Sequence, residues 1–305
     1  EVAITFAVLF FITTLSVSNY QSFNQPLGFK WKNTWEIKVK TGAPWNNEID
    51  RVQFKQLVHA LQKQPEIAST GVSLMPVFER SSMSSSREVN GQNMYFNSNY
   101  VDQDGPLNWG VELISGRWFG EQDNGQNYTE VMVNERFAHQ AFKDSNPIGA
   151  EFGNSLHPER KLWRIVGVFK DFRQMGEFSD PVPYLFHRYQ LDKGSSRGMR
   201  NINITFNTPI NAAYEENLLK LLKGITPNWE FTISSWQAKR DGHIKEFLVP
   251  MAIMFVVVGF LLVMVAMGLF GVLWQNISRR TQEIGLRRAL GASKGSIQLQ
   301  IISEF

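Results

Sequence analysis

The feature that most constrains this chain is a long apolar segment near its C-terminal end. From Phe247 to Ser278 the sequence contains no Asp, Glu, Lys, Arg or His. About 20 apolar residues in a helix suffice to cross the hydrocarbon core of a bilayer. The sequence therefore predicts a stalk and a transmembrane helix over residues 237–278. Pro250, which lacks a backbone donor, predicts a helix start or a kink near its position.

A basic segment follows at once and sets the orientation of that helix. Its cations are Arg279, Arg280, Arg287, Arg288 and Lys294, against Glu283 and Glu304. Lys and Arg close to a membrane span favour the cytoplasmic side. We therefore expect the tail in the cytoplasm, and the part of the chain that precedes the span on the other side of the membrane.

A second apolar run, Val2 to Val17, lies at the N-terminal end and is also free of charge. It predicts a first transmembrane helix and stalk over residues 1–30. Because the chain begins with Glu1 rather than Met, we expect a fragment cut within or just before this span. A cleaved signal peptide is the alternative: Ser16-Val17-Ser18 resembles a cleavage site, but no basic segment precedes the run.

Composition bounds the part between the two runs. Of the 305 residues, about 220 lie between them, enough for one large domain or two small ones with their own cores. The net charge of +3 equals the five cations minus the two anions of the tail, so the rest is neutral overall and nucleic-acid binding is not indicated. The absence of cysteine excludes disulfides and thiol chemistry, and fits a bacterial periplasmic domain.

A β-α-β pattern occurs twice in this middle part. The first copy has a strand at Trp35–Val39, a turn at Gly42-Ala-Pro44, a helix with apolar positions from Ile49 to Leu61, and a strand from about Ile67 to Phe78. The second has a strand at Ile202–Phe206, a helix at Ala212–Leu222 and a strand at Trp229–Ile233. We expect these halves to pair into a small mixed sheet near the membrane.

The halves are separated by an insertion, residues 81–189, that predicts a β-rich subdomain. Its start, Ser81 to Arg87, reads as a flexible, solvated polar loop. Strands are expected at Asn93–Tyr100, Val111–Gly116, Glu130–Val133, Lys161–Val168 and Tyr184–Tyr189. One helix is expected at Asn134–Phe142, with Asn134 as its N-cap.

Ordered motifs in this region resemble a known family. They are Gly116-Arg-Trp-Phe119, Val131-Met-Val-Asn-Glu135-Arg-Phe-Ala138, Asn146-Pro-Ile-Gly149, Ile165-Val-Gly-Val168 and Lys170-Asp-Phe172. In this order they resemble the periplasmic domain of MacB-type ABC transporter permeases. The tail from Arg280 to Ser293 is similar to the segment after the second span of FtsX-like permeases. The two resemblances cover nearly the whole chain.

The fold that the resemblance implies is an α+β periplasmic domain between two transmembrane helices, with porter-like β-α-β halves and an inserted β-rich subdomain. The expected divisions are the periplasmic domain 31–236, its membrane-near part 31–80 and 190–236, its distal part 81–189, a coupling helix 279–292 and the start of a third transmembrane helix 293–305. The chain stops at Phe305, where that third span is expected to begin.

The resemblance also implies partners. The implied protein is a multi-pass permease of the bacterial inner membrane with four spans. It is expected to work as a homodimer or pseudo-dimer with cytoplasmic ABC ATPase subunits. A periplasmic adaptor or cargo is a further expected partner. No Gly-x4-Gly-Lys-Ser/Thr motif occurs, so ATP and Mg²⁺ are expected in the partner subunit and no cofactor in this chain.

The tail also suits a docking helix on physical grounds. Glu283 lies four residues from both Arg279 and Arg287, a spacing that allows ion pairs on one helical face. Gly291 is a natural C-terminal cap. The residues expected to couple to the ATPase are Arg280, Glu283, Ile284, Gly285, Arg287, Arg288, Leu290 and Gly291. The alternative is a juxtamembrane helix held on anionic lipid.

Small residues in the second span predict close packing against another helix. They are Gly259, Ala266, Gly268 and Gly271. The alternative is that they occur there by chance. Neither apolar run holds an ionisable group, which argues against a proton-coupled transporter or an ion channel.

Catalysis is not indicated. The five histidines are scattered, with none at i, i+4 spacing, so neither a metal site nor a catalytic site is expected. Asp102 and Asp104, beside Gly105-Pro106, predict a plain turn rather than a cation loop.

We therefore expect a permease subunit that transmits ATPase-driven motion from the coupling helix to the periplasmic domain, for export or extraction of a periplasmic or membrane substrate. A two-span sensory receptor with a periplasmic ligand-binding domain is the leading alternative. It is disfavoured because Gly285, Gly291 and Gly295 interrupt any coiled coil after the span. A membrane-anchored scaffold without energy coupling is a third alternative.

Overall fold

A computed structural model describes residues 2–41, 48–153, 161–191, 199, 201–210, 212–291, 293 and 295. The chain divides into two compact units. One comprises Asn19–Phe247, and the other comprises Glu1–Ser18 together with Leu248–Phe305.

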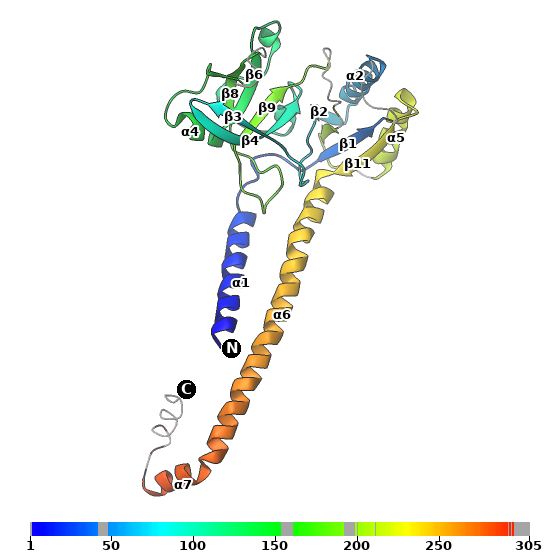
Figure 1. Cartoon of the computed structure of the whole chain (residues 1–305). Helices are drawn as coiled ribbons and strands as arrows, with labels where there is room; N and C mark the ends of the chain where they lie inside the picture. Colours follow the sequence, from blue (N-terminus) through cyan, green and yellow to red (C-terminus); the bar gives the residue numbers. More distant parts are fainter. Residues whose placement is uncertain are drawn as a thin grey trace. The chain divides into compact units, whose positions relative to one another are not determined.

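The larger unit is built on one 11-stranded sheet with the strand order β11-β1-β10-β2-β4-β9-β6-β8-β5, while β3 pairs with β4 and β7 with β8 (Figure 1). The strands are β1 (Thr34–Lys40), β2 (Ile67–Ser73), β3 (Met83–Val89), β4 (Gln92–Val101), β5 (Leu113–Gly116), β6 (Thr129–Asn134), β7 (Glu151–Phe152), β8 (Trp163–Phe169), β9 (Tyr184–Arg188), β10 (Asn201–Phe206) and β11 (Glu230–Ser235). The helices are α2 (Glu48–Gln62), α3 (Gly105–Asn108), α4 (Glu135–Phe142) and α5 (Ala212–Ile225), with a 3₁₀ turn η1 (Glu121–Asp123).

The two predicted β-α-β halves are confirmed and form one subdomain, called the split subdomain below. Its strands follow the order β11-β1-β10-β2, so each half contributes one central and one outer strand. All three pairings are antiparallel, so the prediction of a mixed sheet is wrong for these strands, because a strand of one half separates the two parallel strands of the other. Helices α2 and α5 bury Leu57, Leu61 and Leu222 against the sheet.

The inserted subdomain continues the same sheet through a narrow connection. β2 and β4 share the single register pair Ser73 and Val101. Beyond it, β4 pairs with β9, and β6 pairs with β8, in parallel. The strands predicted in the insertion are confirmed with shifted ends, and so is helix α4, whose N-cap Asn134 accepts a hydrogen bond from the backbone of Phe137 at 3.1 Å. Burial of Phe96, Phe137 and other apolar residues gives this subdomain a core of its own.

The predicted polar loop at Ser81–Arg87 is wrong for most of its length, because β3 occupies Met83–Val89 and pairs in full register with β4. Its side chains alternate between half-buried and exposed, as expected for an edge strand with one face toward solvent. The hairpin turn is Asn90-Gly91, and both residues have positive φ, 50° and 74°. This pair is the usual sequence of a two-residue hairpin and was the overlooked signal.

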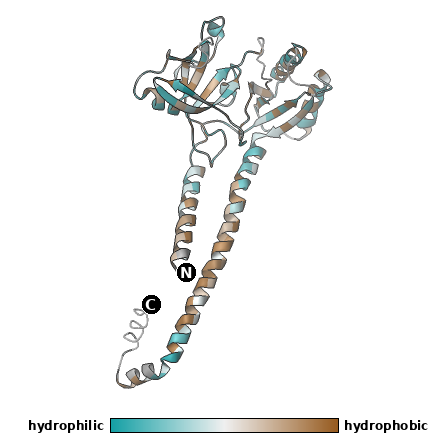
Figure 2. Ribbon diagram, in the orientation of Figure 1, coloured by the Kyte–Doolittle hydropathy of each residue, from teal (hydrophilic) through white to brown (hydrophobic). Residues whose placement is uncertain are grey.

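The smaller unit contains most of the two apolar helices. Among the described residues, one helix is long and apolar enough to cross a membrane, α6 (Trp236–Arg279) (Figure 2). The helix begins before Pro250 and continues through it, so Pro250 is not its start. Helix α1 (Val2–Phe23) carries exposed apolar side chains such as Phe6 and Phe10. Its crossing of a membrane stays a prediction.

A short helix, α7 (Thr281–Ala289), follows α6 after a break at Arg280. Its bounds agree with a separate helix inside the range 279–292. The turn predicted at Gly42-Ala-Pro44 and nearly all of the expected start of a third transmembrane helix lie outside the described residues.

Two glycines test the account of the β3–β4 hairpin. Ala at Gly91, where φ is 74°, should lower the free energy of unfolding by about 1 kcal/mol, because an L-residue is strained in this region. Ala at Gly224, inside α5, should raise it by up to about 1 kcal/mol. An added Cβ meets nothing within 4 Å at either position, so the difference isolates the backbone. Urea unfolding in detergent, followed by tryptophan fluorescence, measures both; equal effects would contradict the turn assignment.

Candidate functional site

The first turns of α6, Trp236 to Phe247, are anchored in the larger unit and are called the α6 head below. Trp236 is completely buried. Its ring meets Phe29 edge-on at a centroid distance of 5.7 Å and Trp109 at 6.1 Å. Aromatic pairs in this arrangement add about 0.5–1.5 kcal/mol each beyond their burial. The start of the helix is thus packed into a core cluster that also includes residues of the inserted subdomain.

One turn further, Lys239 lies between two carboxylates. Its Nζ donates to Glu36 of β1 at 2.7 Å and to Glu79, which follows β2, at 2.8 Å. Glu79 also accepts from Lys38 at 2.5 Å. Burial raises the pKa of the fully enclosed Glu36, although Lys239 acts against it. For the more exposed Glu79, burial also acts upward, but the hydrogen bonds from Lys239 and Lys38 outweigh it and lower the pKa.

Arg240 connects the α6 head to the inserted subdomain. It donates a hydrogen bond to the buried Glu177, which lies in the loop between β8 and β9. Its guanidinium also lies over the ring of Trp31, 4.5 Å from the centroid. Adjacent residues of one helix therefore hold the split subdomain through Lys239 and the inserted subdomain through Arg240.

The β8–β9 loop, residues 170–183, also contacts the end of α1. Arg173, 2% exposed, donates to the backbone oxygen of Ser22 at 2.5 Å and to its hydroxyl at 2.7 Å. Burial lowers the pKa of Arg173. Phe178 of the same loop contacts Phe23 at a centroid distance of 6.0 Å and Phe247 at 4.8 Å. One loop therefore holds both helices where they enter the larger unit.

Gly176 in this loop allows the close approach of α6. Its φ is 95°, and a Cβ there would lie 2.8 Å from Cδ2 of His243. His243 is buried, and burial lowers its pKa, while the nearby Glu246 and Glu177 act in the opposite direction. A larger residue at position 176 would separate the loop from the α6 head.

The connection between the two subdomains depends on a buried carboxyl, Asp102. Its Oδ1 accepts from the backbone N–H of Val72 at 2.9 Å, and its own N–H donates to the Val72 oxygen at 3.1 Å. Asn99 adds a reciprocal pair with the backbone of Met75, at 2.8 and 3.0 Å. Burial raises the pKa of Asp102 from 3.8 to about 7. The predicted plain turn at this place is therefore a junction of the fold.

The predicted ATPase-coupling residues lie at and beyond the end of α6. Arg280 occupies the break between α6 and α7, and Leu290 is 80% exposed. Gly291 has a φ of 97°, as expected for a C-terminal cap. Glu283, Ile284, Gly285, Arg287 and Arg288 lie on α7. The side chains of Glu283, Ile284, Arg287 and Arg288 are outside the described part of the chain, so the ion pairs expected there stay predictions.

The predicted packing residues of the apolar helix all lie within α6 and are exposed: Gly259, Ala266, Gly268 and Gly271. At about 100° per residue, Gly259 and Ala266 share one side of the helix, whereas Gly268 and Gly271 lie toward the opposite side. Their packing against a partner helix stays a prediction.

Sequence reasoning missed the residues that hold the α6 head, Trp236, Lys239, Arg240 and Glu177, and Arg173, which holds the end of α1. The charged turn before the apolar run was a signal that its side chains form ion pairs. Their partners could not be identified, because they lie far away in the sequence: Lys239 and Glu36 are 203 residues apart. Among the residues that the structure describes, no group of three or more His, Asp or Glu side chains could hold a metal ion.

Two family models match the chain. The model described as MacB-like periplasmic core domain matches residues 2–220. The model described as FtsX-like permease C-terminal matches residues 254–305.

Individual proteins show the same similarity. The chain is 27% identical over 205 residues to the Macrolide export ATP-binding/permease protein MacB of Neisseria gonorrhoeae, across 64% of this chain and 30% of that protein. It is 22% identical over 274 residues to the Uncharacterized ABC transporter permease YvrN of Bacillus subtilis, across 82% of this chain and 61% of that protein. The periplasmic region of MacB from Actinobacillus actinomycetemcomitans aligns with a TM-score of 0.48 and 21% identity, over 73% of this chain and 97% of that one. The chain thus spans about 30% of the length of the MacB relative from Neisseria.

Removal of the Lys239 charge tests the anchoring of α6. Lys239→Met leaves Glu36 buried without its main cation and should cost about 3–5 kcal/mol of unfolding free energy at neutral pH. The double variant Lys239→Met/Glu36→Gln should recover most of that loss. Lys40→Met, which breaks an exposed pair with Glu230, should cost less than about 1 kcal/mol. A Lys239→Met variant as stable as the Lys40→Met control in chemical unfolding would refute the anchor.

The carboxyl at the subdomain junction predicts a dependence on pH. In the folded chain the pKa of Asp102 is raised from 3.8 to about 7. The stability that protonated Asp102 contributes is therefore complete below pH 3.8 and is lost as the pH rises through about 7. Asp102→Asn keeps the acceptor for Val72 and stays neutral. Its stability relative to the wild type should therefore rise with pH over this window and level off above it.

Unfolding free energies across this pH range measure the Asp102 effect. Asp144→Asn, at an exposed carboxylate, is the matched control and should follow the wild type. Parallel curves for Asp102→Asn and the wild type would show that the carboxyl does not retain its proton.

Proposed function

Because the chain belongs to the family of proteins with a MacB-like periplasmic core domain, we propose that it is the permease part of an ABC transporter and transmits ATPase-driven motion to its periplasmic domain. The FtsX-like match over residues 254–305 supports the permease assignment. The proposed motion begins at α7, passes along α6 and reaches the larger unit through the α6 head.

The observation that carries this proposal is the attachment of the α6 head to both subdomains. Lys239 binds Glu36 and Glu79, and Arg240 binds Glu177. The helix is continuous from Trp236 to Arg279, and its first residue is buried. It is therefore suited to carry a displacement, because no flexible linker within it would absorb the motion. The β8–β9 loop extends this attachment to α1 through Arg173 and Ser22.

The chemistry of the apolar segment agrees with an energy source outside the membrane. Proton and ion pathways through a membrane use ionisable side chains at depth, and Phe247 to Ser278 contains none. Energy from a cytoplasmic ATPase that docks on α7 satisfies this constraint. The exposed Leu286 and Leu290 offer apolar contacts for such a partner. In this proposal ATP and Mg²⁺ bind the partner subunit.

The proposal also covers the direction of transport, without naming the substrate. The relatives from Neisseria are named macrolide export proteins, which supports export or extraction of a substrate from the periplasm or the membrane. Two copies of the chain, each with its ATPase, would form the working inner-membrane complex, to which a periplasmic adaptor or cargo is added. The receptor alternative lacks support from the family match.

Charge reversal on α7 tests the docking of the ATPase. The variant Arg287→Glu/Arg288→Glu should lose the ATPase that co-purifies with the full-length protein in mild detergent, because two cations of the docking helix become anions. Lys63→Glu/Lys220→Glu makes the same change at exposed positions of the larger unit and should keep it. Co-purification is measured by the mass and stoichiometry of the bound protein. An ATPase bound equally well by both variants, or absent from the wild type, would overturn the proposal.

A further inference from the structure

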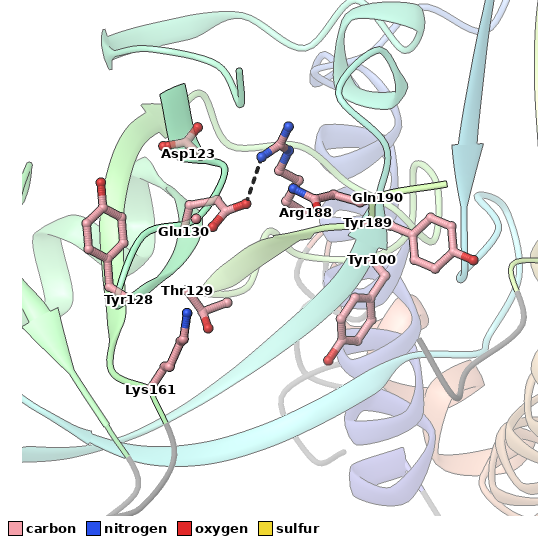
Figure 3. A pocket seen from close by; sticks show the side chains of 10 residues that line it. Tyr100, Asp123, Tyr128, Thr129, Glu130, Lys161, Arg188, Tyr189 and Gln190 are labelled. Atoms are coloured by element: carbon pink, nitrogen blue, oxygen red, sulfur yellow. Dashed lines mark hydrogen bonds and ion pairs between the residues drawn. The ribbon is translucent and has the colours of Figure 1, made fainter. Parts of the chain in front are cut away.

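The structure contains a cleft between the split and the inserted subdomains. A hollow of about 360 Å³ is lined on one side by α2, including Val58 and His59, and on the other by residues of the inserted subdomain. A second hollow of about 270 Å³ adjoins it, since both are lined by Arg188, Tyr189 and Gln190 at the end of β9 (Figure 3). A ligand here would contact both subdomains beside their Asp102 junction.

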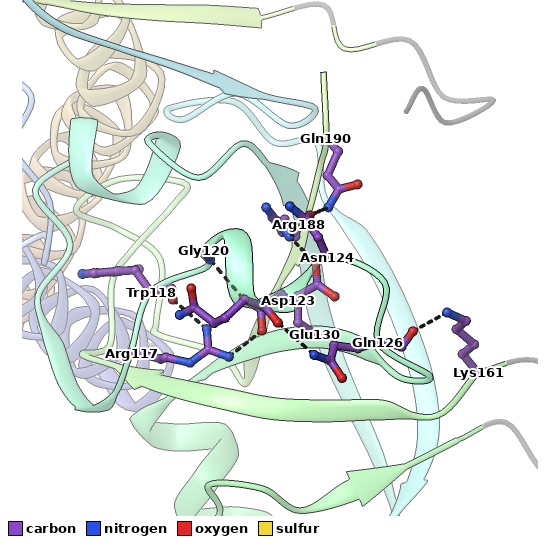
Figure 4. Close-up of polar contacts among 11 residues, drawn as sticks. Arg117, Trp118, Gly120, Asp123, Asn124, Gln126, Glu130, Lys161, Arg188 and Gln190 are labelled. Atoms are coloured by element: carbon purple, nitrogen blue, oxygen red, sulfur yellow. Dashed lines mark hydrogen bonds and ion pairs between the residues drawn. The ribbon is translucent and has the colours of Figure 1, made fainter. Parts of the chain in front are cut away.

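Arg188 places a positive charge on the wall that the two hollows share. Its side chain is 7% exposed. Its Nη1 donates to Glu130 at 3.2 Å and to Asn124 at 3.1 Å, and Asn124 is held in turn by Gln190 at 2.7 Å (Figure 4). Within the described part of the chain, Nε and Nη2 have no hydrogen-bond partner. Arg188 lines both hollows, and a guanidinium with these two donors left over suits a carboxylate, which it can bind at two points.

Carboxylates line the same larger hollow. Asp104 and Glu121 have no cationic partner among the described residues, and burial raises the pKa of Asp104. The turn that carries Glu121 is fixed, because Asp123 accepts hydrogen bonds from the Gly120 backbone at 3.0 Å and from Arg117 at 2.7 Å. The hollow therefore presents a cation held by Glu130 and Asn124, and two carboxylates, to one ligand.

From this arrangement we propose that the cleft binds a short peptide with free termini, whose carboxylate pairs with Arg188 and whose ammonium group lies between Asp104 and Glu121. Val58, Tyr189 and Leu191 supply apolar contacts for a side chain. The volume is that of a small-ligand pocket. This site is independent of the proposed function, since it concerns binding alone.

Other ligand classes fit less well. A simple anion such as phosphate would pair with Arg188 but would share the hollow with Asp104 and Glu121, which repel it. A metal ion lacks a suitable group of ligands among the described residues. A ligand with both charges complements both walls of the hollow, whereas a neutral one makes no ion pair with Arg188, Asp104 or Glu121.

The experiment is calorimetric titration of the full chain in detergent with Ala-Ala-Ala, its N-acetyl form and its C-amide form. The free tripeptide should bind at one site in the millimolar range or tighter. Each cap should weaken binding at least about tenfold, which corresponds to about 1.4 kcal/mol. No saturable binding of the free tripeptide, or equal binding of all three, would overturn the proposal.

Variants assign the two ends of the peptide. Glu121→Gln, at an exposed position, should weaken binding of Ala-Ala-Ala severalfold and leave the N-acetyl form unaffected. Arg188→Lys keeps a cation beside Glu130 but loses the fork, and should weaken only the ligands with a free carboxylate. Glu112→Gln makes the same change as Glu121→Gln at an exposed carboxylate outside the cleft and should bind like the wild type. Identical affinities for the Glu121→Gln and Glu112→Gln variants would contradict the assignment of the ammonium site.

Discussion

The arrangement of the larger unit depends on the contact between Lys239 and its two carboxylates, next to the buried Trp236. Glu36 is fully enclosed, so it is tolerated as an anion only with a cation at hydrogen-bond distance. Lys239 supplies that cation only if α6 begins at its observed place and in its observed rotation. A buried charge pair of this kind contributes little net stability, but it excludes other registers of the helix. We infer that the main effect of this ion pair is to fix the position of α6.

The same logic extends to the inserted subdomain. Arg240 follows Lys239 on the helix and binds Glu177, and the loop that carries Glu177 also holds the end of α1 through Arg173. Gly176 lets this loop approach the helix closely, since no Cβ separates it from His243. The two helices and the two subdomains therefore meet around one short loop, which gives the proposed transmission of motion a defined physical route.

The sequence predicted the features that depend on local pattern and missed those that depend on distant partners. The apolar helix, the two β-α-β halves and the N-cap Asn134 follow from composition, periodicity and one capping residue. Strand β3 was taken for a loop because its serines lack the apolar signal of a strand, and only Asn90-Gly91 marked the hairpin. The contacts of Lys239 and Arg173 join residues more than 150 positions apart, so no spacing could indicate them. The turn at Asp102 likewise gave no sign that β2 would bury its carboxyl.

The central claim is that the α6 head moves as one body with the two subdomains of the larger unit. The chain has no native cysteine, so spin labels can be placed at Gln56→Cys in α2 and Lys245→Cys in the α6 head, both exposed. Their distance distribution would be measured by pulsed electron resonance in the complex with the ATPase, without nucleotide and with a trapped ATP analogue. The account predicts one narrow distribution that the nucleotide leaves unchanged. A second distance that appears with nucleotide would show that the helix moves independently of the domain, and would contradict it.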